Sequence, residues 1–64
     1  MTKNTFISSI DEFENWQSAN LNGEFVDFYI SSDTVYVNMY GLDDDTVDII
    51  ENGISNLELF SKKV

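Results

Sequence analysis

The stretch "EFVDFYISSDTVYVNMY", residues 24–40, decides the fold. Residues 24–30 and 34–40 each alternate with a period of two, and the polar residues "SSD" separate them, which is the pattern of a β-hairpin. In the register that pairs Ile30 with Val35, six apolar side chains share one face: Val26, Phe28, Ile30, Val35, Val37 and Met39. Because residues that share one face of a hairpin pack together, we expect this face to form the core.

The opposite face of the predicted hairpin carries aromatic side chains. The same register pairs Tyr29 with Tyr36 and Phe25 with Tyr40. Tyrosine-rich patches with few charges are typical of the centres of protein interfaces, so these four residues are candidates for binding a partner or a second copy of the chain. Alternatively, the terminal segments fold over them, or the pairs only stabilise the sheet.

An acidic segment, "GLDDDTVDIIENG", follows the hairpin. Asp44 or Asp45 is predicted to cap a helix that runs to about Asn52, with Gly53 as the first residue beyond its end. The apolar positions that we expect to point inward are Val47, Ile50 and Ile54.

The segments on either side complete the predicted fold. Residues 9–20, "SIDEFENWQSAN", predict a helix, because Ser9 and Glu12 form a capping box and apolar residues recur at helical spacing at Ile10, Phe13 and Trp16. Residues 54–60, "ISNLELF", predict a closing strand, and residues 3–7, "KNTFI", form a first strand in one of two versions of the fold.

The predicted class is α+β, with a small antiparallel sheet and two helices on one side of it. The element order is β-α-β-β-α-β if the first strand forms, which is the split β-α-β arrangement, and α-β-β-α-β if it does not. We expect residues 1–64 to form a single domain, because no proline, repeat or low-complexity linker divides the chain.

The composition argues against an enzyme. The chain has no cysteine and no histidine, and its three lysines lie close to the termini, so the usual general bases and activated nucleophiles are missing. The run "DDDTVDIIE" offers hard oxygen ligands for calcium, but in an EF-hand frame starting at Asp43 the glycine position is Asp48 and the bidentate glutamate position is Ile54. We therefore expect no metal and no cofactor.

The net charge of −9 restricts the partners. Twelve acidic residues against three lysines and no arginine should repel nucleic acids and anionic membranes. No signal-peptide core or long apolar run is visible, so a cytoplasmic location is expected. Because crowded carboxylates repel, we also expect their pKa values to be raised in the folded state.

Part of this charge forms a stripe on the second predicted helix. Asp44, Asp48 and Glu51 follow one another at i, i+4 and i+7, and no lysine in the helix balances them. The alternative is an ordinary solvated helix face. The acidic candidates for partner binding are Asp11, Glu12, Glu14, Asp27, Asp43, Asp44, Asp45, Asp48 and Glu51.

In its small size, its acidity and its lack of catalytic residues, with "DDDTVDIIE" and "IDEFENW" as the acidic segments, the chain resembles the phage-encoded inhibitors that imitate DNA. These are anti-CRISPR proteins, anti-restriction proteins and uracil-DNA glycosylase inhibitors. The resemblance implies a non-enzymatic anti-defence inhibitor, a protein partner with a basic nucleic-acid-binding groove, and a bacterial host cytoplasm. The alternative is a regulatory or structural interaction module that homodimerises, or binds a partner, through the aromatic sheet face.

Overall fold

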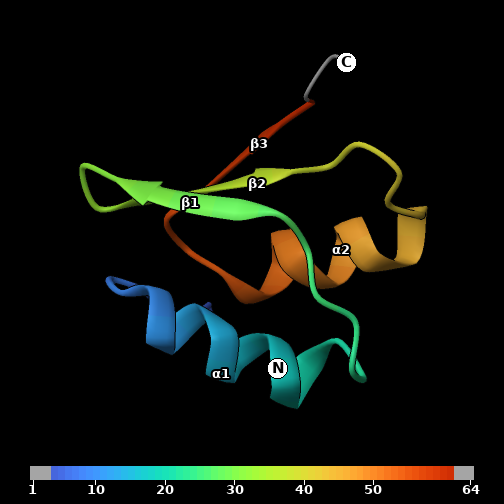
Figure 1. Cartoon of the computed structure of the whole chain (residues 1–64), viewed down its shortest axis with the longest axis horizontal. Coiled ribbons are helices and arrows are strands. Elements are labelled where there is room, and N and C mark those ends of the chain that lie inside the picture. The colour runs from blue at the N-terminus through green and yellow to red at the C-terminus, as the bar shows by residue number, and fades with distance from the viewer. Residues whose placement is uncertain (1–3, 62–64) are drawn as a thin grey trace.

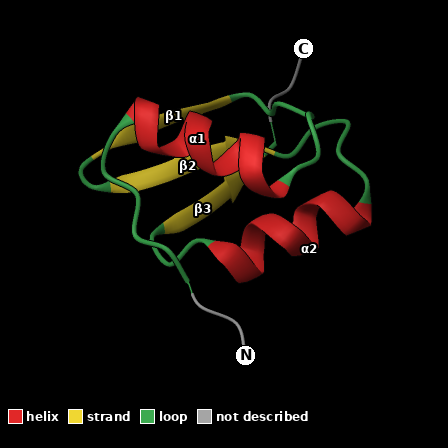
Figure 2. Ribbon diagram, turned by 90° about the horizontal axis from the view of Figure 1, so that it is seen from below, coloured by secondary structure: helices red, strands yellow, loops and turns green. Residues whose placement is uncertain are grey.

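Two helices cover one face of a three-stranded sheet in the computed structural model, which describes residues 4–61 (Figures 1 and 2). The elements follow in the order α1 (Ile10–Asn20), β1 (Phe28–Ser31), β2 (Thr34–Asn38), α2 (Asp44–Gly53) and β3 (Leu57–Phe60). This arrangement confirms the α+β class and the helices on one side of the sheet, and it is the predicted order without a first strand.

The β1–β2 hairpin has the predicted register. Phe28 pairs with Val37 and Ile30 with Val35, in antiparallel strands. Two residues, Ser32 and Asp33, form the turn with φ angles of 53° and 64°. Positive φ at both central positions is the type I′ geometry, whose twist matches that of the strands it joins.

Both strands of the hairpin are shorter than predicted. Val26 is buried but precedes β1, and Met39 is 42% exposed, so the prediction that Met39 faces the core is wrong. The reason is a turn at the end of β2, in which the Leu42 N–H donates to the Met39 carbonyl at 3.1 Å and Gly41 has a φ of 80°.

The sheet is mixed, and the prediction of a wholly antiparallel sheet is wrong. Its strand order is β1-β2-β3, and β3 pairs with β2 in parallel, with Val35 opposite Leu57 and Val37 opposite Leu59. Parallel neighbours need a crossover connection, usually a helix, and α2 provides one between β2 and β3.

The N-terminal segment contributes a single bridge and no strand among the described residues. Thr5 bridges Ile54 in parallel, with hydrogen bonds from its N–H to the Gly53 carbonyl (2.8 Å) and from the Ser55 N–H to its carbonyl (3.1 Å). Over residues 4–7 the structure therefore follows the version of the fold without a first strand, and Lys3 lies outside the described residues. The physical reason is that the segment meets the short linker between α2 and β3, which is not itself a strand.

Asn56 holds this segment to the rest of the protein. Its side chain accepts from the Ile7 N–H at 3.1 Å and donates to the Ile7 carbonyl at 2.7 Å and to the Asp33 carbonyl at 2.6 Å. Its own carbonyl accepts from the Val35 N–H at 2.8 Å. One residue thus joins the N-terminal segment, the hairpin turn and the start of β3.

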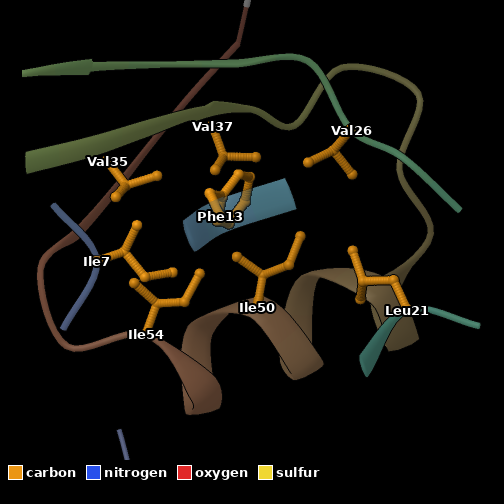
Figure 3. Close-up of a cluster of buried hydrophobic side chains, with 8 residues drawn as sticks. All are labelled: Ile7, Phe13, Leu21, Val26, Val35, Val37, Ile50 and Ile54. Atoms are coloured by element: carbon orange, nitrogen blue, oxygen red, sulfur yellow. The ribbon is translucent and has the colours of Figure 1, made fainter. Parts of the chain in front are cut away.

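The core forms where the sheet, both helices and the N-terminal segment meet (Figure 3). Phe13 of α1 lies in the middle of the cluster in this view and is fully buried. The buried apolar residues are Ile7, Phe13, Leu21, Val26, Val35, Val37, Ile50 and Ile54.

Helix α1 begins as predicted but buries different residues. Ser9 is the N-cap, and its hydroxyl oxygen accepts from the Glu12 N–H at 3.2 Å. Ile10, one of the apolar residues at helical spacing, is 57% exposed, whereas Gln17 is fully buried. The Gln17 side-chain oxygen accepts from the Val26 N–H at 2.7 Å, and its Nε2 has no hydrogen-bond partner within residues 4–61.

Both predicted ends of the second helix need correction. The N-cap of α2 is Asp43, not Asp44 or Asp45, because the Asp43 carboxylate is the one that accepts from the Thr46 N–H at 3.0 Å. Gly53 is the last residue of the helix rather than the first beyond it. Its missing side chain makes room for α1, since a Cβ at Gly53 would lie 2.5 Å from Cζ2 of Trp16.

Candidate partner-binding surfaces

The described part of the chain carries negative charge only. All twelve acidic residues lie within residues 4–61 and all are exposed, whereas the three lysines are residues 3, 62 and 63. No side chain in the described range can therefore form an ion pair with a carboxylate. The negative charge of residues 4–61 is therefore exposed to solvent and is not balanced by basic side chains of the same range.

On α2, the predicted stripe forms. Asp44, Asp48 and Glu51 are exposed, and Ile50 is the fully buried residue of the helix. Asp45 is also exposed in the first turn. Asp43 has a different role, because its carboxylate caps the helix, and the hydrogen bonds from Thr46 lower its pKa below the ordinary value.

On α1, Glu12 is held by the chain that leads into the helix. Its Oε1 accepts from the Ser8 N–H at 2.8 Å and from the Ser8 hydroxyl at 2.9 Å. These bonds lower the pKa of Glu12, since they favour the charged form. For Glu12 and Asp43, the expectation of raised pKa values is therefore wrong, because local hydrogen bonds favour the charged form of each carboxylate. Asp11 and Glu14, in the same helix, are also exposed.

The predicted acidic residues lie in three separate places. Figure 1 shows that the first turn of α1 and the first turn of α2 lie at opposite ends of the helical layer. Asp27 belongs to neither helix and precedes β1. Within residues 4–61 no group of three or more acidic side chains is arranged to hold a metal ion. The acidic residues of the helices therefore form an extended surface rather than one cluster.

The face of the sheet away from the helices carries an aromatic cluster of Tyr29, Tyr36 and Phe60. Tyr29 and Tyr36 pair across the hairpin as predicted, and their rings stack at a centroid distance of 4.8 Å. Phe60 lies 5.6 Å from the Tyr29 ring, at a 59° tilt. Phe60 was not among the predicted interface residues, because its position follows from the parallel register of β3.

The predicted pair of Phe25 and Tyr40 does not form. Phe25 lies before β1 and Tyr40 in the turn after β2, and they are 62% and 65% exposed. The Tyr40 N–H donates to the side-chain oxygen of Asn38 at 3.0 Å, so the chain leaves the line of the strand at this point. These two rings therefore lie outside the aromatic cluster.

Two carboxylates accompany the aromatic cluster. Asp27, whose carbonyl accepts from the Asn38 N–H at 2.8 Å, lines a hollow of about 230 Å³ together with Phe28, Tyr29 and Phe60. Glu58 of β3 is opposite Tyr36 in the sheet and is exposed. The aromatic face is thus acidic as well.

The two surfaces, the acidic helices and the aromatic sheet face, are the features from which a function can be argued. In residues 4–61 no helix has the length and apolar character needed to span a membrane. No protein-family model, no curated protein and no solved structure matches the chain.

Proposed function

We propose that this protein is a non-enzymatic binding protein. Its acidic helical layer, meaning the exposed carboxylates of α1 and α2, occupies the basic nucleic-acid-binding surface of a protein partner. One observation carries the proposal: twelve carboxylates are exposed over residues 4–61 and none has a basic side chain of that range as a partner. A phage anti-defence inhibitor of a nuclease, glycosylase or defence complex is the form of this function that fits the chain's size and charge.

The physical basis is competition for lysine and arginine side chains. Duplex DNA presents one negative charge per about 1.7 Å of axis, and proteins that grip it do so with these basic groups. The helices that carry the carboxylates are fixed relative to each other, because Phe13 and Ile50 anchor α1 and α2 in one core. A rigid acidic surface occupies a basic groove without offering a base or a phosphodiester bond.

The α2 stripe is not explained by the stability of the helix. Asp44 and Asp48 repel at i, i+4, and Glu51 lies in the C-terminal part of the helix, where the dipole disfavours an anion. Each effect costs a few tenths of a kcal/mol up to about 1 kcal/mol. Asp44 lies in the first turn, where the dipole favours an anion, but the charges of Asp48 and Glu51 are better explained by binding than by folding.

The test compares two triple variants of equal net charge. In the first, Asp44, Asp48 and Glu51 are replaced by lysine; in the second, Glu24, Asp27 and Glu58, which are exposed outside the helices, are replaced by lysine. Each protein is used as bait in a bacterial lysate, and captured proteins are identified by mass spectrometry. We expect the unmodified chain and the second variant to capture a nucleic-acid-binding protein that duplex DNA displaces, and the first variant to lose it.

The opposite result would overturn this function. Capture that the first variant retains at physiological salt would assign the α2 carboxylates to solvation alone. Capture that only the second variant loses would move the binding surface to the aromatic face. Circular dichroism of both variants confirms that the fold is kept.

A second candidate function is an interaction module that uses the aromatic cluster. The exposed stack of Tyr29 on Tyr36 favours it, since Tyr29, on the edge strand β1, leaves 51% of its surface exposed. Homodimerisation through this face would bring Asp27 and Glu58 of two acidic chains together. A dimer should therefore sediment as such mainly at high salt, where repulsion is screened, and the double variant Tyr29→Ala with Tyr36→Ala should abolish it.

A further inference from the structure

A groove with a volume of about 420 Å³ lies between the two helices. Figure 2 shows both helices on the same side of the sheet. Trp16 and Asn20 of α1 line the groove from one helix, and Asp48, Ile49, Asn52 and Gly53 of α2 line it from the other. It contains one carboxylate of the α2 stripe and thus belongs to the acidic helical layer.

The base of the groove is rigid. Trp16 fills the space that Gly53 leaves, and its ring lies parallel to that of Phe13, at a centroid distance of 5.8 Å and an interplanar angle of 7°. Because Phe13 is fully buried, the indole is fixed from the core outward. A ligand would therefore meet an aromatic surface already in place, and the Trp16 ring would lose little freedom on binding.

The polar groups of the groove are suited to a ligand that donates hydrogen bonds. Asp48 contributes an exposed carboxylate, and no basic side chain of residues 4–61 lines the groove. The Asn20 amide nitrogen donates to the Trp16 carbonyl at 2.8 Å, so the remaining polar atom of that side chain, Oδ1, is an acceptor. Ile49, which is 43% exposed, adds an aliphatic wall.

We propose that this groove binds one arginine side chain of the basic partner, an inference that rests on the proposed function. The guanidinium group donates to the Asp48 carboxylate and stacks on the Trp16 indole, and the methylene groups contact Ile49. Arginine suits the site better than lysine, because the planar guanidinium both stacks on aromatic rings and forms forked hydrogen bonds with a carboxylate.

The experiment uses the single tryptophan of the chain as its reporter. The whole protein is titrated with an unlabelled peptide of alternating glycine and arginine, and with matched peptides in which citrulline or lysine replaces arginine. Tryptophan fluorescence and the indole N–H signal in nuclear magnetic resonance spectra are followed. We expect the arginine peptide to shift both signals, the lysine peptide to shift them less, and the neutral citrulline peptide to leave them unchanged.

A matched pair of variants separates the groove from the general acidic field. Asp48→Asn and Asp45→Asn remove the same charge from the same helix, but only Asp48 lines the groove. We expect Asp48→Asn to weaken binding of the arginine peptide about tenfold, as for the loss of one charge-assisted hydrogen bond, and Asp45→Asn to weaken it less than about twofold.

Three results would overturn the inference. Equal losses in the two variants, with no movement of the indole signal, would show that the acidic surface attracts the peptide diffusely. If the lysine peptide shifts the tryptophan signals as much as the arginine peptide does, the groove has no preference for arginine. If the citrulline peptide does so, the groove does not require a cation. None of these results contradicts the proposed function, which fails separately if the first triple-lysine variant keeps its nucleic-acid-binding partner.

Discussion

The two faces of the sheet differ in how deeply they bury their aromatic side chains, as two neighbouring residues of β1 show. Phe28 is half-buried against the core, and its ring contacts Phe13 edge-on at 4.4 Å, whereas Tyr29, the next residue, is 51% exposed and stacks on Tyr36. The packed face holds the protein together, and the open face presents aromatic and acidic groups to solvent. The difference indicates that substitutions on the open face can change binding without unfolding the domain.

The largest effect should come from the centre of the packed face. Phe13→Ala removes a fully buried ring that contacts both Trp16 and Phe28, and we expect a loss of about 3–5 kcal/mol of unfolding free energy. The total unfolding free energy of a 64-residue domain is about 3–10 kcal/mol at the usual 0.05–0.15 kcal/mol per residue. Because Phe13→Ala can therefore unfold the protein, the milder variant Phe13→Leu is measured beside it in urea titrations. If Phe13→Leu costs no more than Tyr29→Ala, the contrast between the faces is broken.

Asn56→Ala should rank second. The substitution removes three side-chain hydrogen bonds and leaves the backbone N–H and carbonyl of Ile7 without those partners. At about 1 kcal/mol for each bond, we expect a loss of about 2–3 kcal/mol in chemical denaturation. Asn52→Ala, on the exposed surface of α2, is the control and should cost less than 0.5 kcal/mol, a typical value for surface positions.

Gly53→Ala tests the contact between the helices. Alanine should gain about 1 kcal/mol in helix propensity but lose about 1–3 kcal/mol by overpacking, because its Cβ would meet the Trp16 ring. We therefore expect net destabilisation of about 1 kcal/mol. In a Trp16→Leu background the clash is relieved, and the same Gly53→Ala change should become stabilising. A Gly53→Ala protein more stable than the unmodified chain would show that the ring moves aside freely.

On the open face, Tyr29→Ala should cost only about 0.5–1.5 kcal/mol, the value of an aromatic pair beyond its burial. The thermal midpoint measures this loss, and Phe25→Ala, an exposed ring outside the aromatic cluster, should leave the midpoint nearly unchanged. A loss as large as that of Phe13→Leu would show that the cluster is part of the core.

The smallest effect concerns pH. The pKa values of Glu12 and Asp43 are lowered from their ordinary values of 4.5 and 3.8, so the folded state binds these protons less readily than the unfolded chain. Their contribution to stability is complete above the unfolded pKa values and is lost as the pH falls through the folded ones.

The double variant Glu12→Gln with Asp43→Asn keeps both capping interactions without a titrating group. Its thermal midpoint should therefore fall less between pH 5 and pH 3 than that of the unmodified chain. A larger fall in the double variant would contradict this assignment.

Local patterns in the sequence were sufficient for the parts of the fold that depend on neighbours. The Ser9 cap, the helical spacing of Phe13 and Ile50, and the pairing of Ile30 with Val35 follow from short-range rules, and all are confirmed. Registers over a few residues are specified by turn geometry and alternation, which is why the hairpin could be predicted.

Features that depend on distant residues could not be predicted in this way. The parallel pairing of β3 depends on how α2 crosses the sheet, and Gly53 resembles a helix stop until Trp16 is known to lie against it. Gln17 occupies a core position because the Val26 N–H needs an acceptor there. The α2 stripe was predicted residue by residue, but the groove beside Asp48 was not, since it requires the relative placement of two helices.

The bonds made by Asn56 also bear on the order of folding. Ile7 and Asn56 are separated by 49 residues, whereas the hairpin closes within a few residues of its turn. Closing so long a loop is slow, so the N-terminal segment should dock after the hairpin and both helices have formed. During synthesis on the ribosome, Ile7 must remain undocked until Asn56 has left the exit tunnel. In amide hydrogen exchange, protection of the Ile7 N–H would then report completion of the whole fold rather than formation of any single element.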